Sequence, residues 1–230
     1  MWTFPVPSAN RPVRAYHGAV TGTTATAPPR NAFREQQWRE AHERYLDCAR
    51  QVFGSLGYHA ATVADIVAAA NGSRATFYAH FRDKADIAAA LFERVLPAGA
   101  AMYGRITEFP ELNREHVRRW LDEHVLPFWA TYGVEIDLVN HAMAADPGVA
   151  ARHYQWGMEA VRQLRPYLAR WTGEHEQAGL TRALLLVLQL ERLCYHWLVR
   201  GVEHERGMVL DILADLWVRE LAVLREGPRG

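Results

Sequence analysis

The sequence is poor in lysine, in cysteine and in net charge. Lysines and arginines number 26 together, the same as aspartates and glutamates, and Lys84 is the only lysine. A neutral chain cannot attract nucleic acid by its overall charge, so any contact with DNA depends on local arrangement. The two cysteines, Cys48 and Cys194, lie far apart in apolar contexts. This favours buried thiols in a reducing compartment over a disulfide bond.

Long apolar segments are also missing. A membrane-spanning helix needs roughly 18–20 apolar residues, and the best candidate, residues 183–190, contains Gln189 and is followed by Glu191 and Arg192. The N-terminus lacks the compact apolar stretch of a signal peptide. We therefore expect a cytoplasmic protein that makes no contact with a membrane.

Motifs for catalysis, metals and cofactors are absent as well. Eleven histidines are present, but no Glu-x-x-His, His-x3-His or Cys-x-x-Cys pair occurs, which argues against a di-iron or zinc site. There is no glycine-rich phosphate loop and no Gly-x-Ser-x-Gly elbow. We expect no catalytic residue, no metal and no cofactor, and an enzyme is the least favoured interpretation.

The first 30 residues show neither a helical nor a strand period. They contain Arg11, Arg14 and Arg30 and no acidic residue, so we predict a disordered basic tail. Two interpretations stay open: a dispensable extension, or a basic arm that lies along a DNA groove.

Beyond the tail, apolar residues recur at helical spacing. Half of all residues are apolar, and no alternating strand pattern occurs, so we predict an all-α protein. Residues 35–56 form the first predicted helix, with Gly57 as its stop. A capping pattern at Thr62 starts a second helix over residues 63–70. That helix ends at residues 71–72, Asn and Gly, the types that best tolerate a left-handed backbone.

The segment that follows has the features of a DNA-reading element. Ser73 caps a short helix that runs through Ala79, and a further helix begins near Asp83. Two short helices joined by a tight turn, with an amphipathic helix on each side, form a helix-turn-helix. We predict that Arg74 contacts guanine and that Thr76 contacts a thymine methyl group or a phosphate. Tyr78, His80 and Lys84 are expected to contact phosphates. The candidate DNA contacts on and beside this helix are Ser73, Arg74, Ala75, Thr76, Tyr78, His80 and Lys84.

Four ungapped motifs lie between Tyr45 and Ile87: A-R-x-x-F-x-x-x-G-Y, T-V-x-x-I, S-R-x-T-F-Y-x-H-F and D-K. With them this stretch resembles the N-terminal domain of the TetR family of regulators. The resemblance implies a homodimer of about nine helices per chain, whose paired third helices enter successive major grooves of a palindromic operator in double-stranded DNA. Transferred position by position, it implies DNA contacts at Thr62, Arg74, Thr76, Tyr78, His80 and Lys84.

The turn departs from the family pattern. The family has Gly followed by Val or Ile, whereas Asn71 and Gly72 stand here, so a buried aliphatic side chain is lost. The charge of this segment is also unremarkable for a DNA binder, because residues 31–95 hold eight basic and eight acidic residues. We therefore expect modest affinity per half-site, with dimerisation needed for useful occupancy.

The rest of the chain is expected to form further helices. We assign residues 1–30 to the tail, residues 31–95 to the DNA-binding domain, which includes the start of the fourth helix, and residues 96–230 to a ligand-binding and dimerisation domain. The expected C-terminal helices are 112–131, 134–145, 149–171, 180–200 and 206–224. The breaks between them are expected at Pro110, residues 132–133, residues 146–147, residues 173–179 and Gly201.

Large aromatic residues gather in the C-terminal domain, where six of the eight tryptophans lie. A bundle rich in large rings packs with gaps, and an aromatic gap with a few polar groups is typical of a ligand site. We predict a site for a small apolar or aromatic ligand, with ordinary core packing as the alternative for each residue. Glu191 is interpreted as structural. The candidate ligand contacts are Trp120, Phe128, Trp129, Tyr132, Asn140, His141, Trp156, Gln189, Arg192 and Tyr195.

The segments L-V-L-Q-L-E-R-L-C-Y (186–195) and L-D-I-L-A-D-L-W (210–217) resemble the last two helices of TetR members related to the ethionamide-resistance repressor. That resemblance implies an apolar cleft among the C-terminal helices and a homodimer formed through the last two. Val187 and Leu190 stand where that repressor has asparagines, which implies a less polar ligand or an anchor from another helix.

These features predict a ligand-responsive transcriptional regulator, with repression as the family default. Ligand would favour a conformation in which the fourth helix pivots and the two recognition helices no longer match the groove spacing. The alternative is a helix-turn-helix protein that acts as a protein–protein adaptor without specific DNA binding.

Overall fold

The computed structural model describes residues 30–228, with side chains described from Ala32 onward. The chain divides into two compact units, residues 1–38 and 39–230, and all contacts considered below lie within the second. The tail predicted for residues 1–30 lies outside the described residues, except for the backbone of Arg30.

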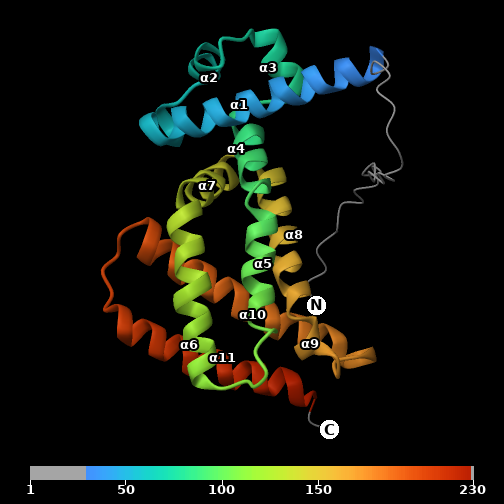
Figure 1. Ribbon diagram of the computed structural model, residues 1–230, viewed down its shortest axis with the longest axis vertical. Coiled ribbons are helices and arrows are strands. Elements are labelled where there is room, and N and C mark those ends of the chain that lie inside the picture. Colours follow the sequence, from blue (N-terminus) through green and yellow to red (C-terminus); the bar gives the residue numbers. More distant parts are fainter. Residues whose placement is uncertain (1–29, 229–230) are drawn as a thin grey trace, which may run out of the picture. The chain divides into compact units, whose positions relative to one another are not determined.

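Every regular element among the described residues is a helix, which confirms the all-α prediction. The α-helices are α1 (Arg30–Ala60), α2 (Val63–Ala69), α3 (Arg74–His80), α4 (Lys84–Glu93), α5 (Leu96–Arg105), α6 (Arg114–Trp120), α7 (Leu126–Ala145), α8 (Pro147–Gln163), α9 (Arg165–Leu168), α10 (Glu176–Cys194) and α11 (Arg206–Glu226) (Figure 1). The π-helical turn η1 (Leu121–Val125) joins α6 to α7, η2 (Gly173–His175) precedes α10, and η3 (Tyr195–Val199) extends α10. With joined segments taken as one helix and the single turn of α9 set aside, residues 30–228 hold the nine principal helices expected.

The second helix lies where it was predicted, whereas the first is longer than the predicted residues 35–56, because α1 begins at Arg30 and continues beyond Gly57 to Ala60. Gly57 has φ 76° and interrupts α1 with a kink. Thr62 and Asp65 form a complete capping box at the start of α2, and Asn71 adopts the left-handed conformation at φ 47°. A break also precedes Pro97, because α4 ends at Glu93 and α5 starts at Leu96 with the proline in its first turn.

Two of the predicted C-terminal breaks are wrong. The helix does not stop at residues 132–133 but runs on from Arg114 to Ala145. A Cβ at Gly133 would meet Val199 at 3.4 Å, an ordinary contact, so packing does not require a glycine there. The break predicted over residues 173–179 is too long, because only Gly173–His175 interrupts the helices and α10 begins at Glu176. At Gly179 a Cβ would lie 2.5 Å from the indole of Trp171, so this glycine is a packing position inside a helix.

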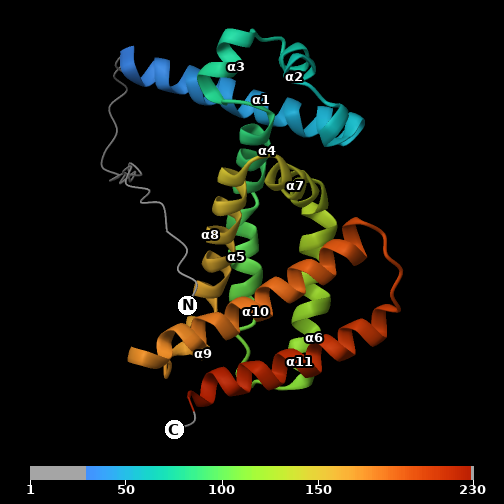
Figure 2. The same cartoon turned by 180° about the vertical axis from the view of Figure 1, so that it is seen from behind.

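Two apolar cores fill the second unit. One joins α1, α2 and α3 to α4, α7 and the start of α8, and it includes Tyr45, Ile66 and Phe77. The other lies among the C-terminal helices and includes Trp120 and Trp217. Figures 1 and 2 show α5 beside α8, and show α10 and α11 together at the end away from α2 and α3. No described helix is both long and apolar enough to cross a bilayer.

Candidate functional site

Side chains at the N-termini of α2 and α3 cap these two helices of the helix-turn-helix. Thr62 Oγ1 accepts the backbone N–H of Asp65 at 3.2 Å, and the Asp65 carboxylate accepts the backbone N–H of Thr62 at 2.9 Å. At the next helix, Ser73 Oγ accepts the backbone N–H of Thr76 at 3.0 Å. These caps satisfy N–H groups that would otherwise lack a partner, so α2 and α3 begin at defined residues.

The turn between α2 and α3 depends on a single close approach. The hydroxyl of Tyr45 in α1 donates a hydrogen bond to the backbone carbonyl of Ser73 at 3.0 Å. A Cβ at Gly72 would lie 2.1 Å from that hydroxyl oxygen. The buried phenol therefore lies where a side chain at position 72 would go, which explains why Asn71 and Gly72 serve here in place of Gly and an aliphatic residue.

The outer face of α3 is open to solvent, whereas its inner face is anchored. Phe77 is fully buried and lies edge-on to Tyr45, with ring centroids 5.7 Å apart. Arg74, Ala75 and Tyr78 are exposed, and the Tyr78 side chain has a relative exposure of 56%. A rigid helix thus presents a guanidinium, a small side chain and a phenol outward.

The other predicted contacts on α3 are less open. Thr76 is half-buried, with its hydroxyl 2.8 Å from that of Ser73. His80 is half-buried beside His42 of α1, with ring centroids 5.4 Å apart. Burial lowers the pKa values of both imidazoles, and for His80 the nearby His42 and Arg44 lower it further. The neutral forms of both rings are therefore favoured.

Lys84 has a position that the sequence did not indicate. Its ammonium donates to the backbone carbonyls of Tyr58 at 2.7 Å and Ala61 at 3.0 Å, and it lies 4.5 Å from the centre of the Tyr58 ring. A cation at the carbonyl end of a helix is favourable. Lys84 therefore fastens the end of α1 to the start of α4.

A cavity of about 80 Å³ lies among α4, α5, α7, α8 and α10. Most of its wall is aromatic or aliphatic. Three of the predicted ligand residues line it, namely Phe128, Trp129 and Trp156. Phe92 of α4 and Trp156 of α8 meet in its wall with ring centroids 4.7 Å apart. The lining is that of a small-ligand site, but the volume is well below the roughly 300–1,000 Å³ of most ligand pockets, so a ligand larger than a few atoms would have to widen the cavity.

The polar groups of the cavity come from residues outside the predicted set. His153 Nε2 of α8 lies 3.0 Å from Glu191 Oε1 of α10, and both side chains are largely buried. Tyr103 of α5 is almost fully buried in the wall, and burial together with the charge of Glu191 raises its pKa well above the usual value. Glu159 also lines the cavity and pairs with Arg162 on its own helix. No described lysine or arginine lines the cavity.

The other predicted ligand residues lie elsewhere. Trp120 is a core residue whose indole N–H donates to the Met102 carbonyl at 2.7 Å. Tyr132 is half-buried on α7 against the ring of Phe128, and Gln189 is half-buried on α10. The residues that do not line this cavity are Trp120, Tyr132, Asn140, His141, Gln189, Arg192 and Tyr195.

Four of those residues belong to a separate polar group between α7 and α10–η3. The Tyr195 hydroxyl donates to Asp137 at 2.9 Å, and His141 lies 3.5 Å from the same carboxylate. Arg192 reaches Asn140 at 3.4 Å and lies over the ring of Tyr195. Tyr195 and His141 are thus partners of Asp137, whereas Arg192 and Asn140 contact each other.

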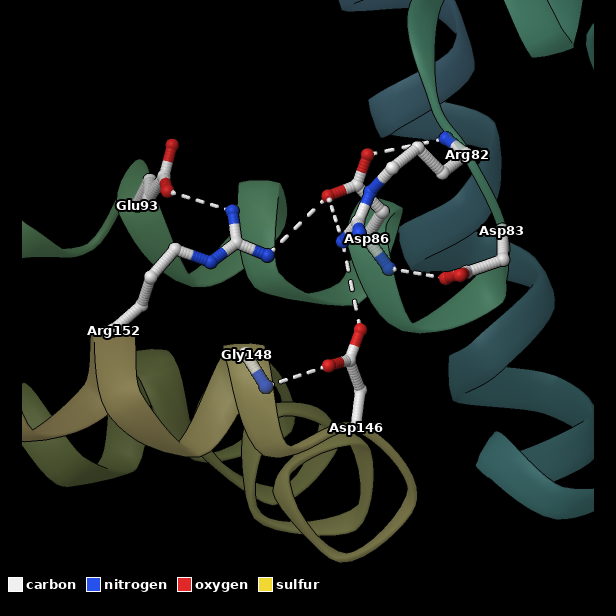
Figure 3. Close-up of polar contacts among 7 residues, drawn as sticks. All are labelled: Arg82, Asp83, Asp86, Glu93, Asp146, Gly148 and Arg152. Carbon is white, nitrogen blue, oxygen red and sulfur yellow. Dashed lines mark hydrogen bonds and ion pairs between the residues drawn. The ribbon is translucent and has the colours of Figure 1, made fainter. Parts of the chain in front are cut away.

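A network of charges joins α4 to α8 and to the α7–α8 turn (Figure 3). The Arg152 guanidinium of α8 lies 3.3 Å from Asp86 and 3.5 Å from Glu93, both on α4. Arg82 reaches Asp86 at 3.2 Å and Asp146 at 3.5 Å. Burial alone would raise the pKa of Asp86, but hydrogen bonds from Arg82 and the charges of both arginines hold it below its usual value. Asp86 is therefore ionised and shared between two helices.

The sequence carried a partial signal for the residues it missed. His153 and Glu191 each stand on a predicted helix, His153 next to Tyr154 and Glu191 next to Leu190, among further polar residues. That pattern does not say which helices meet, so the pairing across α8 and α10 depends on the tertiary fold.

The last two long helices expose an apolar surface. Leu185 and Leu188 of α10 and Met208 and Ile212 of α11 are exposed in the single chain. The spacing of three and four residues puts each pair on one face of its helix. Such an uncovered apolar surface is typical of a protein–protein contact.

Comparisons with known proteins agree with this architecture. Residues 46–91 match the sequence model of the family described as bacterial regulatory proteins, tetR family, so the helix-turn-helix is similar to the N-terminal domain of that family. No curated protein matches the chain by sequence.

Solved structures share the fold across both parts of the chain. A putative TetR-family transcriptional regulator from Mesorhizobium loti aligns with 80% of this chain and 96% of its own, at 13% identity and a TM-score of 0.54. The fatty acid degradation regulator FadR from Bacillus halodurans aligns with 78% of this chain and 93% of its own, at 18% identity and a TM-score of 0.53. PfmR from Thermus thermophilus, a TetR-family regulator, aligns with 81% of this chain and 100% of its own, at 19% identity and a TM-score of 0.52. The chain therefore has the fold of these regulators, an N-terminal helix-turn-helix domain followed by a helical domain.

Proposed function

We propose that this protein is a ligand-responsive transcriptional regulator that binds a palindromic operator as a homodimer and represses until ligand binds. The observation that carries the proposal is the outer face of α3, where Arg74 and Tyr78 are exposed on a helix capped at Ser73 and anchored by Phe77. A rigid helix that presents such groups suits the major groove.

The roles on the DNA-binding face follow from position. Arg74 reads a base, with guanine as the partner that suits a guanidinium. Tyr78 and the two capping residues, Thr62 and Ser73, contact phosphates, while Ala75 permits close approach of the helix. Thr76 and His80, being half-buried, contribute at the edge of this surface.

Lys84 acts mainly through structure in this proposal. Its ammonium is engaged by the carbonyls of Tyr58 and Ala61, so it positions α3 by holding α1 on α4. The carboxyl half of α4 is fastened to α1 as well, because Arg94 pairs with both Glu43 and Asp47. A shift of α4 would therefore carry α1, and with it the core that anchors α3.

Dimerisation through α10 and α11 is the simplest use of their exposed apolar faces. Two copies related by a twofold axis would cover Leu185 and Ile212 and set the two α3 helices a fixed distance apart. Half-sites one helical turn apart, about 34–36 Å, are the spacing that such dimers read. The resemblance of these helices to those of the ethionamide-resistance repressor subgroup supports this arrangement.

Ligand binding is proposed for the aromatic cavity. Phe92 on α4 lines it, and the neighbouring Glu93 pairs with Arg152, which itself precedes the cavity residue His153. A molecule that pushes apart Phe92 and Trp156 would shift α4 relative to α8. Release of DNA requires roughly 3–5 kcal/mol of differential affinity between the two conformations. At about 25 cal/mol per Å² of apolar area, an additional burial of about 150–200 Å² provides it.

The test of DNA binding needs no ligand. Genomic fragments retained by the purified protein are sequenced, and the enriched fragments are expected to share a palindrome. Arg74→Ala and Tyr78→Ala are each expected to lower affinity for that fragment by about tenfold or more, from roughly 1–3 kcal/mol per lost contact. Arg105→Ala, an exposed position on α5, is the matched control.

The outcome separates the two candidate functions. If no sequence is enriched, or if both α3 variants retain DNA as well as the parent protein, specific DNA reading is excluded and the adaptor interpretation stands. As a DNA-binding regulator the protein would act in the compartment that holds the chromosome, consistent with the cytoplasmic location expected from the sequence.

A further inference from the structure

The charge inside the cavity narrows the class of ligand. Among the described residues, the ionisable groups in its wall are Glu159, Glu191, His153 and the phenol of Tyr103. Arg162 pairs with Glu159, whereas Arg152 pairs with Asp86 and Glu93 outside the wall. Glu191 is therefore the wall carboxylate without an arginine or lysine partner, and an anionic ligand would be repelled by it.

Glu191 has capacity for a further partner. Its Oε1 lies 3.0 Å from His153 Nε2, and among the described residues no other hydrogen bond or ion pair reaches this carboxylate. The pair has a net charge of −1 when the imidazole is neutral. The adjacent Arg192 lies over the Tyr195 ring and reaches Asn140, so it does not neutralise the pair by contact.

The hydroxyl of Tyr103 is a second polar group in the wall of the cavity. Tyr103 is more than nine-tenths buried, and its hydroxyl makes no hydrogen bond to a described residue. The hydroxyl is not one of the fully buried side-chain atoms that lack a partner, so it is available to a ligand without requiring one. Tyr103 and Glu191 line the same cavity, so a polar head group at Glu191 shares the cavity with this hydroxyl.

Aromatic faces complete the arrangement. Phe92, Phe128, Trp129 and Trp156 all line the cavity. Aromatic rings attract cations through the negative charge of their faces, and they attract an uncharged apolar body through burial. Carboxylate plus aromatic wall is a combination that favours an organic ammonium group over a carboxylate or phosphate of the same size.

We propose that the cavity binds an apolar amine, a molecule with an aromatic or short alkyl body and a protonated amino group that Glu191 accepts. The amino group donates to the free oxygen of Glu191, and the body widens the cavity by separating the rings of Phe92 and Trp156, which are in contact without ligand. Tyr103 lines the same cavity. The inference rests on the proposed function only where it treats the bound amine as the signal for DNA release. Binding itself is independent of DNA.

Three probes of one shape test the charge preference on the unchanged protein: 3-phenylpropylamine, 3-phenylpropan-1-ol and 3-phenylpropanoate, each titrated by calorimetry at pH 7. The amine is expected to bind about tenfold more tightly than the alcohol, as a charge-assisted hydrogen bond in a buried site should. The carboxylate is expected to bind most weakly. Equal or tighter binding of the alcohol or the carboxylate would overturn the proposal, and so would absence of binding by all three at millimolar concentration.

Substitutions assign the preference to one residue. Glu191→Gln keeps the shape of the side chain. It should lower the affinity for the amine to that for the alcohol and leave the affinity for the alcohol unchanged. Glu174→Gln, at an exposed position where the side chain is 88% accessible, should change nothing. His153→Leu removes the competing hydrogen-bond donor to Glu191 and should strengthen the amine preference. An amine preference that survives in Glu191→Gln would overturn the assignment.

The result is distinguishable from failure of the proposed function. Operator retention is measured without any probe, so loss of the amine preference leaves the DNA-binding proposal intact. Conversely, a protein that prefers the amine but retains no specific DNA keeps the ligand assignment and loses the regulator.

Discussion

The guanidinium of Arg152 lies 3.3 Å from the carboxylate of Asp86 (Figure 3). The contact joins the helix that lines the cavity to the helix that supports the DNA-binding core, because Asp86 stands on α4 and the next residue after Arg152 is the cavity residue His153. Two sites that share such a contact are coupled through it if the contact changes between the two conformations.

We predict that Arg152→Gln weakens the response to ligand more than it weakens the fold. The side chain is 38% exposed, so its ion pairs are worth about 1 kcal/mol or less to stability. Coupling is expected to fall by about threefold or more, within the roughly 0.5–2 kcal/mol that such contacts modulate. The measurement is operator affinity with and without 3-phenylpropylamine.

The control for this variant is Arg119→Gln, whose parent side chain pairs with Glu115 on its own helix. It should leave the ratio of the two affinities unchanged. A full response in Arg152→Gln would show that α8 and α4 communicate by packing alone.

A methyl group at Gly72 should disrupt the helix-turn-helix. The Cβ would overlap the buried Tyr45 hydroxyl at 2.1 Å, and that ring is held between α1 and Phe77. Gly72→Ala is expected to destabilise by about 1–3 kcal/mol, typical of overpacking, and to abolish operator binding. Chemical denaturation and DNA retention measure the two effects.

Gly54→Ala is the matched control, because a Cβ there meets nothing within 4 Å and the residue lies within α1. It should stabilise the protein by about 0.5–1 kcal/mol. If Gly72→Ala proves as stable as the parent protein, the turn must rearrange around the phenol.

The packing of α1 against α3 should weaken in mild acid. Burial lowers the pKa values of His42 and His80 below the usual 6.5, so the unfolded chain binds protons at a higher pH than the folded one. Stability is then complete above about pH 6.5 and falls as the pH drops from that value toward the lowered pKa values. Thermal unfolding between pH 8 and pH 5 checks this.

His42→Phe should flatten that pH dependence, since a phenyl ring can keep the stacking on Phe81, where the ring centroids are 4.7 Å apart. His204→Phe, at an exposed loop position, should retain the parent profile. An unchanged slope in His42→Phe would assign the acid sensitivity to other groups.

A charged side chain on the exposed face of α10 or α11 should weaken the dimerisation that we propose. Leu185 is 61% and Ile212 57% exposed in the single chain. In a twofold dimer the copy of each residue in both subunits would be buried. Leu185→Glu or Ile212→Glu should weaken dimerisation by about 30-fold or more, from roughly 2 kcal/mol per central contact. Sedimentation over a range of protein concentration measures it.

Leu56→Glu is a comparable change on α1, where the parent side chain is 51% exposed, and it should leave the oligomeric state as it was. A protein that stays dimeric with glutamate at both 185 and 212 would place the interface on another surface.

Local chemistry by itself determined the helix-turn-helix. Thr62, Ser73 and Asp83 cap the helices that follow them, and Asn71 takes the left-handed turn. These are interactions between residues fewer than five apart, so the order of the residues is enough to predict them. The exposure of Arg74 follows equally from the 3.6-residue period once Phe77 is taken as buried.

The tertiary structure alone decided which residues meet across helices. Gly133 and Gly179 look like helix ends in sequence, yet they lie within helices, and at Gly179 the indole of Trp171 fills the space that a Cβ would take. Lys84 binds carbonyls more than twenty residues away. A glycine, a lysine or a His–Glu pair can have several structural roles. Which role each residue has depends on the neighbours that long-range packing places beside it. Spacing along one helix carries no information about that neighbour.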